Sequence, residues 1–282
     1  MTEIQTEKFI DVDKILAGKS PKLAKNLPKF IISYLKRIIH QEQLNSFMYR
    51  NREKIGSSFL EAILEEFGVN VVVKGAENIP ICGQQLISSN HPLGGLDGIA
   101  LIREVGKYRN PIKFPVNDLL MNVTNLQEFF IPINKHGSNA ENRVIFDQAF
   151  ESENIMLYFP AGLVSRKQKG VIKDLEWKKT FITMARKHKR DVIPTFIDGK
   201  NSMFFYRLAN IRKNLSIKEN FEMLYLVDEM YKQNNKTINI IFGKPIPYTV
   251  FDNSKKDLEW AQLVKNHVYK LEKDRNADFV IN

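Results

Sequence analysis

Apolar positions near the start of the chain recur at helical spacing. In residues 28–50 they return every three or four positions, which predicts an amphipathic helix. The cations of its first half are Lys29, Lys36 and Arg37. A second helix is predicted over 56–67 by the same spacing. We expect residues 1–67 to form an N-terminal helical segment, in which residues 1–20 are a polar lead-in.

Beyond residue 68 short apolar runs of strand length alternate with helical patterns. The expected strands lie at 71–73, 86–88, 112–115, 129–133, 155–159, 191–197 and 238–242. The expected helices lie at 93–106, 139–151, 175–188, 219–232 and 256–273. Such alternation predicts an α/β domain over 68–282, with a mixed, mostly parallel sheet flanked by helices. Pro194 interrupts one strand and predicts an edge or a bulge there.

Composition narrows the class of protein. One cysteine, Cys82, excludes an internal disulfide and a cysteine-based zinc site. No run of apolar residues approaches the roughly 18 needed to span a bilayer, and the acidic N-terminus does not resemble a signal peptide. We therefore expect a cytoplasmic protein that is soluble or peripheral to a membrane.

The charge is strongly positive and unevenly placed. The chain has 42 Lys and Arg against 32 Asp and Glu, for a net charge of +10. Residues 163–190 hold ten cations and two acids, which accounts for +8 of that excess. A basic surface fits nucleic acid, an anionic membrane or acidic small molecules.

The stretch richest in residues suited to catalysis is SSNHPLGGLDG, residues 88–98, between an expected strand and an expected helix. In open α/β sheets ligands bind beyond the carboxyl ends of the strands. His91 can accept a proton near neutral pH, and Asp97 can hold the imidazole ring in one orientation. Glycines beside them allow a sharp turn and close approach of a substrate. The alternative is a surface histidine in a glycine turn, with Asp97 capping the next helix.

Two further stretches follow strands, and each is weaker evidence alone. Residues 159–167, FPAGLVSRK, offer backbone N–H groups for an anion and Arg166 for a phosphate or carboxylate. The alternative there is a turn before a solvated basic helix. Residues 192–202 add an Asp-Gly turn. The sequence contains no GxGxxG, GxxxxGK[ST] or HExxH motif, and its other histidines are scattered, so no metal or nucleotide site is predicted.

Taken in order, NHPLGGLDG, FFIPINKHG, FPAGLVSRK and VIPTFIDGKNS resemble the blocks of the glycerophospholipid acyltransferase superfamily, which includes the lysophosphatidate acyltransferases. The similarity covers residues 70–245 and is greatest to the bacterial haemolysin-like or ornithine-lipid acyltransferase branch. That family places four residues between the histidine and the aspartate, whereas five separate His91 from Asp97. Ala161 stands where the family commonly has a glutamate.

The resemblance implies an O-acyltransferase that moves a fatty acyl group from acyl-carrier protein or acyl-CoA to the hydroxyl of a lyso-lipid. The acceptor would be a lyso-amino-acid lipid or 1-acylglycerol-3-phosphate. His91 would be the general base and Asp97 its partner. Residues expected to bind substrate are Asn90, Gly94, Gly95, Lys135, Gly162, Ser165 and Arg166. Neither a metal nor any cofactor beyond the acyl donor is implied.

Such substrates imply contact with an anionic membrane, and we expect a peripheral protein at the inner face of the cell membrane. The helix predicted at 28–39 would supply that contact, or cover the sheet. Three other functions stay open. One is a catalytically silent protein that binds lipid or anionic surfaces, and the intact His91 and Asp97 argue against it. The second is a nucleic-acid-binding protein that uses residues 163–190, though no aromatic recognition signature supports it. The third is a hydrolase that uses His91, with Ser88 and Ser89 nearby but neither in a GxSxG motif.

Overall fold

A seven-stranded sheet forms the centre of the molecule, in a computed structural model that describes residues 8–19, 21–117, 120–133 and 140–281. The strand order is β1-β9-β8-β2-β5-β3-β4. The strands are β1 (Asn70–Lys74), β2 (Gln85–Ser89), β3 (Ile112–Val116), β4 (Phe130–Pro132), β5 (Ile155–Tyr158), β8 (Asp191–Ile197) and β9 (Thr237–Phe242). All seven expected strands are therefore confirmed, and each end lies within one residue of the expected position.

Five neighbouring strands, from β8 to β4, run parallel, while β9 runs antiparallel to β8 and carries β1 with it. This confirms the mixed, mostly parallel sheet. Pro194 lies inside the sheet, on β8 between β9 and β2. The antiparallel register changes by one residue between the Val192–Ile246 bridge and the Thr195–Phe242 pair, so Pro194 sits at a bulge.

Helices cover both faces of the sheet because its central strands are buried on both sides. Leu86 of β2 belongs to the core on one face, and Ile87 to the core on the other. On the Ile87 face lie α5 (Gly56–Glu66) and α6 (Gly95–Gly106). The Leu86 face is covered by α7 (Ala140–Glu151), α8 (Thr180–Lys187) and α11 (Asp257–Leu271). This three-layer arrangement leaves the carboxyl ends of the parallel strands as one edge on which a site can form.

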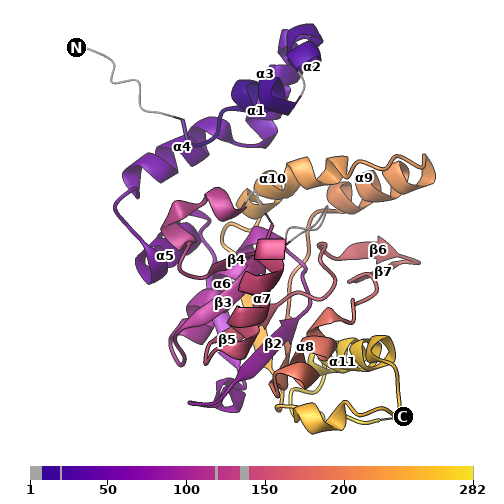
Figure 1. Ribbon diagram of the computed structural model, residues 1–282. Helices are drawn as coiled ribbons and strands as arrows, with labels where there is room; N and C mark the ends of the chain where they lie inside the picture. The colour runs from indigo at the N-terminus through magenta and orange to yellow at the C-terminus, as the bar shows by residue number, and fades with distance from the viewer. Residues whose placement is uncertain (1–7, 20, 118–119, 134–139, 282) are drawn as a thin grey trace.

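The N-terminal helices start at the end of the molecule opposite α11, and the last of them leads back to the sheet domain (Figure 1). They are α1 (Val12–Lys19), α2 (Pro21–Asn26), α3 (Lys29–Ile38) and α4 (Gln41–Arg50). The single helix expected over 28–50 is wrong, because the chain breaks at His40, whose φ is 52°. The polar lead-in over residues 1–20 is also wrong, since α1 occupies part of it.

The segment from α4 to α5 packs into the body of the molecule. Phe47 of α4 and Phe59 of α5 are buried in the same core as Ile87 of β2. Residues on both sides of the domain boundary expected at residue 67 thus belong to one core. That boundary stays a prediction. In the part of the chain that the structure describes, no helix is both long and apolar enough to cross a membrane.

The segment after β5 differs most from expectation. The helix expected over 175–188 begins only at Thr180, and a hairpin of β6 (Arg166–Gln168) and β7 (Val171–Lys173) precedes it. A helix that the sequence patterns did not reveal, α9 (Met203–Asn214), follows β8. The helix expected over 219–232 is a 3-10 turn, η4 (Phe221–Tyr225), that runs into α10 (Leu226–Tyr231).

Four of the ten cations of residues 163–190 have partners within the protein. Arg190 is fully buried, and its guanidinium donates to the carbonyls of Phe150 (2.7 Å) and Asn154 (2.6 Å). Arg166 is buried as well, and Lys187 pairs with Asp147 and Arg186 with Asp257 at the surface. The cations that this segment leaves for nucleic acid are therefore fewer than its sequence suggests.

Candidate active site

The site begins where β2 ends, beside the end of β8. The Asn90 side chain is buried and bridges the two strands. Its Nδ2 donates to the carbonyl of Ile197 (2.8 Å), and its Oδ1 accepts from the Ile197 N–H (2.7 Å). Asn90, expected to bind substrate, thus uses both ends of its amide to fix the strand end that carries the next residue, His91.

His91 and Asp97 face one another across the glycine turn. The His91 Nδ1 lies 3.1 Å from the Asp97 Oδ1. Asp97 is fully buried, whereas the His91 side chain is 18% exposed. The imidazole ring stacks on Phe159, with ring centroids 4.2 Å apart. Because a carboxylate only accepts, Nδ1 carries the proton of this hydrogen bond, and the ring is held from one edge and one face.

The chain turns sharply between His91 and Asp97. Gly94 has φ 80° and ψ −118°, a backbone conformation open to glycine, and α6 starts at the next residue. Asp97 lies in the first turn of α6, where its Oδ2 accepts from the Leu93 N–H (2.8 Å) and its Oδ1 from the Gly98 N–H (3.1 Å). A carboxylate is favoured at a helix N-terminus, so the helix start both positions Asp97 and stabilises its charge.

A second carboxylate, Asp174, holds the His91 backbone from the other side. Its Oδ1 accepts from the His91 N–H (3.2 Å) and from the Ser165 hydroxyl (2.5 Å), and its Oδ2 accepts from the Trp177 indole (2.9 Å). The Ser165 N–H in turn donates to the His91 carbonyl (2.7 Å). Burial raises the pKa of the Asp174 carboxyl, against the effect of these donors. Ser165, expected to bind substrate, therefore ties its own loop to the histidine loop.

Arg166 points away from this network into a buried ion pair. Its Nη2 donates to Glu222 Oε1 (2.8 Å), and Arg212 holds Glu222 Oε2 (2.9 Å). Glu222 is fully buried, and burial lowers the pKa of the Arg166 guanidinium while Glu222 offsets part of that loss. The structure thus gives Arg166 a partner within the protein in addition to any substrate.

The three remaining candidates differ in what can be said of them. Gly162 has φ 64°, and its N–H donates to the Phe159 carbonyl (3.0 Å), so this N–H already has an acceptor. Gly95 opens α6. Lys135 lies outside the described residues. Over the described ranges no group of His, Cys, Asp and Glu side chains is arranged to hold a metal ion.

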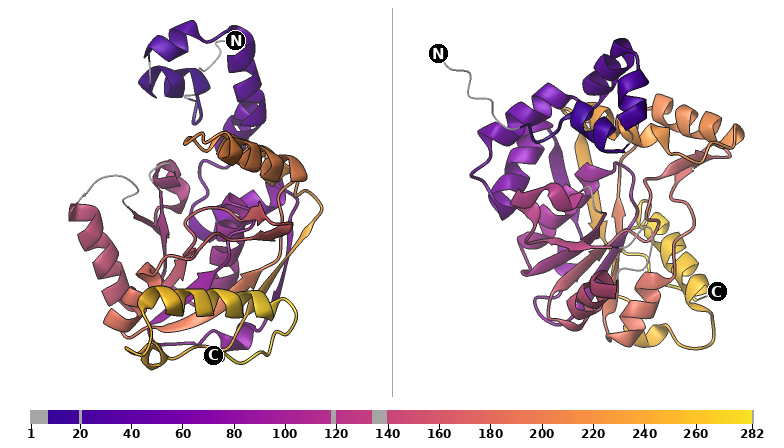
Figure 2. Two further views of the ribbon diagram at one scale, coloured as in Figure 1. Left: turned by 90° about the vertical axis from the view of Figure 1, so that its right-hand side faces the viewer. Right: turned by 45° about the horizontal axis from the view of Figure 1, so that its top comes forward.

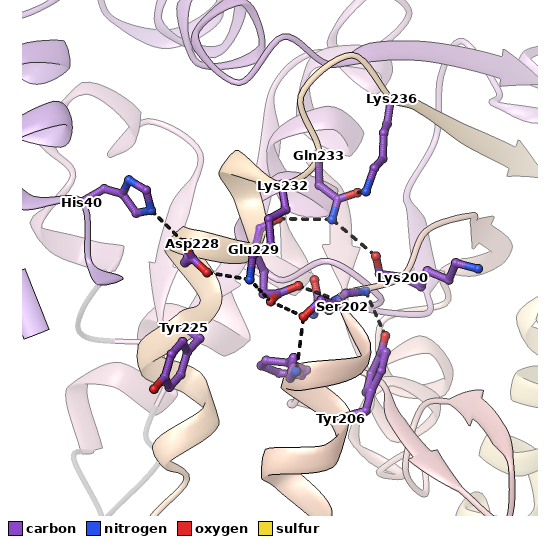
Figure 3. Close-up of polar contacts among 12 residues, drawn as sticks. His40, Lys200, Ser202, Tyr206, Tyr225, Asp228, Glu229, Lys232, Gln233 and Lys236 are labelled. Atoms are coloured by element: carbon purple, nitrogen blue, oxygen red, sulfur yellow. Dashed lines mark hydrogen bonds and ion pairs between the residues drawn. The ribbon is translucent and has the colours of Figure 1, made fainter. Parts of the chain in front are cut away.

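Helix α10 covers the glycine turn and is itself fixed by a polar cluster. A Cβ atom on Gly94 would lie 3.3 Å from Leu226, and one on Gly95 would lie 3.2 Å from the Met230 sulfur. Glu229 accepts from the Ser202 hydroxyl (2.6 Å) at the start of α9, and Asp228 pairs with His40 (3.0 Å) between α3 and α4 (Figure 3). The absence of side chains at Gly94 and Gly95 thus lets α10 pack closely against the turn.

The comparison with known families decides the class. The sequence matches the profile of the family described as "Acyltransferase" over residues 14–278. The chain belongs to the acyltransferase family. Its activity is acyl transfer, and the dyad of His91 and Asp97 lies within the matched region.

Two curated relatives of this acyltransferase carry the same name, lyso-glycine lipid O-acyltransferase. The protein from Bacteroides thetaiotaomicron is 52% identical over 265 residues, covering 93% of this chain and 97% of the relative. The protein from Phocaeicola vulgatus is 50% identical over 265 residues, covering 93% and 95%. Among solved structures, the 1-acyl-sn-glycerophosphate acyltransferase PlsC from Thermotoga maritima matches with a TM-score of 0.46 and 16% identity, over 88% of this chain and 95% of that one.

Sequence reasoning about this acyltransferase missed Asp174, Trp177 and Glu222. One signal was present for Asp174, which is one of only two acids among the ten cations of residues 163–190. An acid kept in such a segment, three residues before a tryptophan, points to a buried contact. Glu222 gave no local signal, because its partner Arg166 lies 56 positions away.

Proposed function

We propose that this acyltransferase moves a fatty acyl group from a thioester donor, acyl-carrier protein or acyl-CoA, to the hydroxyl of a lyso-lipid with an amino-acid head group. The observation that carries the proposal is the contact of 3.1 Å between the His91 Nδ1 and the buried Asp97. The relatives' name supports glycine as the head group. Both proteins that carry this name are about as long as this chain and are identical to it at about half of the aligned positions.

His91 acts as the general base of the proposed reaction. Its Nδ1 is committed to Asp97, so Nε2 is the atom that takes the proton from the acceptor hydroxyl. The alcohol oxygen attacks the thioester carbonyl carbon as that proton moves. When the tetrahedral intermediate collapses, the carbon–sulfur bond breaks, and the imidazolium returns its proton to the departing thiolate. Asp97 stabilises the imidazolium between these two steps.

Backbone N–H groups at the start of α6 are the proposed donors to the oxyanion. The first N–H groups of a helix lack intrahelical acceptors, and the positive end of the helix dipole favours developing negative charge. Gly94 and Gly95 bring this helix start within four residues of His91. One such donor is typically worth about 3–4 kcal/mol of transition-state stabilisation.

A lyso-lipid acceptor calls for contact with a membrane, and we assign that contact to α3 at the inner face of the cell membrane. Phe30 is 73% exposed and Tyr34 is 38% exposed on this helix. Lys29, Lys36 and Arg37 lie on the same helix, which has no acid. An amphipathic basic helix of this kind binds at the boundary of anionic head groups and acyl chains.

The proposed function is tested by incubating the purified protein with acyl-carrier-protein and CoA thioesters against three acceptors: lyso-glycine lipid, lyso-ornithine lipid and 1-acylglycerol-3-phosphate. We expect lyso-glycine lipid to gain the mass of one acyl chain, measured by mass spectrometry. Transfer to 1-acylglycerol-3-phosphate alone would contradict the amino-acid head group. Absence of transfer to all three acceptors from either donor would contradict the proposed reaction.

A further inference from the structure

Helix α9 exposes an apolar stripe that the rest of the protein does not cover. Phe204 is 48% exposed, Ile211 is 56% exposed, and Leu215, just after the helix, is 65% exposed. Residues separated by seven and eleven positions lie on one face of a helix. These three side chains, the α9 stripe, therefore point in one direction, away from the core that holds Phe205 and Tyr206.

Aromatic contacts join the α9 stripe to α3 through η4. The Phe204 ring packs edge-on against Tyr225, with ring centroids 5.0 Å apart. Tyr225 packs against Tyr34 of α3, and the two hydroxyls hydrogen-bond at 2.5 Å. Phe221 and Leu224 of η4 are also exposed, by 48% and 41%. Exposed apolar side chains thus continue across three elements.

The charges around this surface are mainly positive. Residues 203–218 contain four cations and no acid, and residues 28–39 contain three cations and no acid. The exposed Glu219 stands just before η4, and Lys36 pairs with Asp13 of α1, whereas Glu222 is fully buried between Arg166 and Arg212. Large apolar side chains among which cations outnumber acids match the chemistry of an anionic lipid bilayer, in which acyl chains lie beneath negative head groups.

Helix α10 connects this surface to the turn that carries the dyad. The ends of α3 and α9 are both held by α10, through Asp228 to His40 and through Glu229 to Ser202 (Figure 3). The same helix covers the turn that carries His91, since Leu226 lies against Gly94. The views of the molecule place α3 and α9 together at the end opposite α11 (Figures 1 and 2).

We infer that α9 and η4, together with α3, form the surface on which the protein docks onto an anionic bilayer. The surface consists of Phe30, Tyr34, Phe204, Ile211, Leu215, Phe221 and Leu224 with the cations of the two helices. This assignment deepens the proposed function and rests on it, because the bilayer would be the source of the lyso-lipid. Docking through α9 holds the glycine turn towards the lipid head groups, so that an acceptor reaches His91 while its acyl chain stays in the membrane.

Two exposed substitutions test the α9 stripe without touching the dyad. The variant carries Ile211→Glu and Leu215→Glu. The matched control carries Ile81→Glu and Val280→Glu, two exposed apolar side chains, 87% and 51% accessible. Ile81 precedes β2, and Val280 lies beyond α11. Cosedimentation is measured with vesicles of phosphatidylglycerol and phosphatidylcholine in equal parts, and with phosphatidylcholine alone. Circular dichroism and thermal melting check that both variants remain folded.

We expect the wild type and the control to bind the anionic vesicles equally and the α9 variant to bind at least tenfold more weakly. Acylation of an acceptor presented in vesicles should fall in parallel, while a short-chain, water-soluble acceptor should be acylated at the wild-type rate. Three results would overturn the assignment. They are unchanged vesicle binding by the α9 variant, dissociation of a dimer by these substitutions, and an activity loss confined to the carrier-protein donor. Failure of the wild type to acylate any acceptor would count against the proposed function, and vesicle binding would still decide the docking surface.

Discussion

At the scale of residues, two carboxylates hold different parts of His91. Asp97 holds the imidazole ring through Nδ1 at 3.1 Å, and Asp174 holds the backbone N–H of the same residue at 3.2 Å. The two acids come from different parts of the chain, the start of α6 and the segment after β7. A side chain fixed at both its ring and its backbone loses little entropy when the substrate binds, which is the condition for efficient proton transfer.

The Asp174 carboxyl has a signature in the pH dependence of stability. Burial raises its pKa in the folded protein above the ordinary value of 3.8. The folded protein therefore keeps this proton to higher pH than the unfolded chain, and the carboxyl contributes less stability as pH rises through its folded pKa. We expect the free energy of unfolding of the wild type, relative to Asp174→Asn, to decrease as pH rises from 3.8 towards neutrality. Urea unfolding at a series of pH values measures it.

Asp252→Asn is the matched control for that titration. Asp252 is exposed, and hydrogen bonds from Ser254 lower the pKa of its carboxyl. Its contribution should appear as pH rises and disappear on acidification, so the sign of the pH dependence is opposite. A relative stability that increases with pH at Asp174 would contradict the burial of that carboxyl.

The sequence revealed the dyad but not the residues that orient it. His91 and Asp97 are six positions apart on one turn, so their meeting is a local event that spacing predicts. Asp174 is 83 positions from His91, and Arg166 is 56 from Glu222. Contacts of that range depend on which strands become neighbours, and a single sequence does not contain that order.

At the scale of elements, the glycine turn and α10 form one unit. Gly94 has φ 80°, and a Cβ atom there would lie 3.3 Å from Leu226. Gly94→Ala should therefore lower the free energy of unfolding by about 1–3 kcal/mol, the usual cost of a side chain in a sparsely populated backbone conformation. We also expect a lower kcat, because the turn sets the separation of His91 and Asp97.

Gly106→Ala is the comparison for that substitution. Gly106 ends α6, and a Cβ atom there would meet only Ile112, at an ordinary contact distance of 3.7 Å. Thermal melting and steady-state kinetics of the two variants measure the difference. Equal stability of the two variants would show that the turn at Gly94 tolerates a side chain.

Elements with a buried apolar face were the ones that the sequence predicted well. The strands of the sheet appeared as apolar runs because both faces of each central strand are covered. Helix α9 has apolar residues on two faces, with Phe205 and Tyr206 buried and Ile211 exposed, so its sequence does not show the single apolar stripe that predicts a helix. The break between α3 and α4 at His40 depends on a contact with Asp228, far along the chain.

At the scale of the whole molecule, charge and shape act together. Some of the cations behind the net charge of +10 are buried, as Arg166 and Arg190 are, and others lie on α3 and α9, the helices of the proposed docking surface. Cations near an anionic bilayer contribute about 1 kcal/mol each, and salt screens them over about 10 Å at 0.1 M ionic strength. We expect cosedimentation with phosphatidylglycerol vesicles to weaken steadily as sodium chloride rises from 0.05 to about 0.5 M. Binding that does not change with salt would contradict a role for these cations.

The proton transfer at His91 is the claim on which the account depends, and the rate of acyl transfer by His91→Ala tests it most directly. The wild type and the variant are compared at saturating donor and acceptor, and circular dichroism confirms that the variant is folded. The account predicts a kcat lower by about 10²–10⁴-fold, the usual contribution of a general base. A kcat within a factor of about two of the wild type would contradict it, since that ratio corresponds to only about 0.4 kcal/mol of barrier.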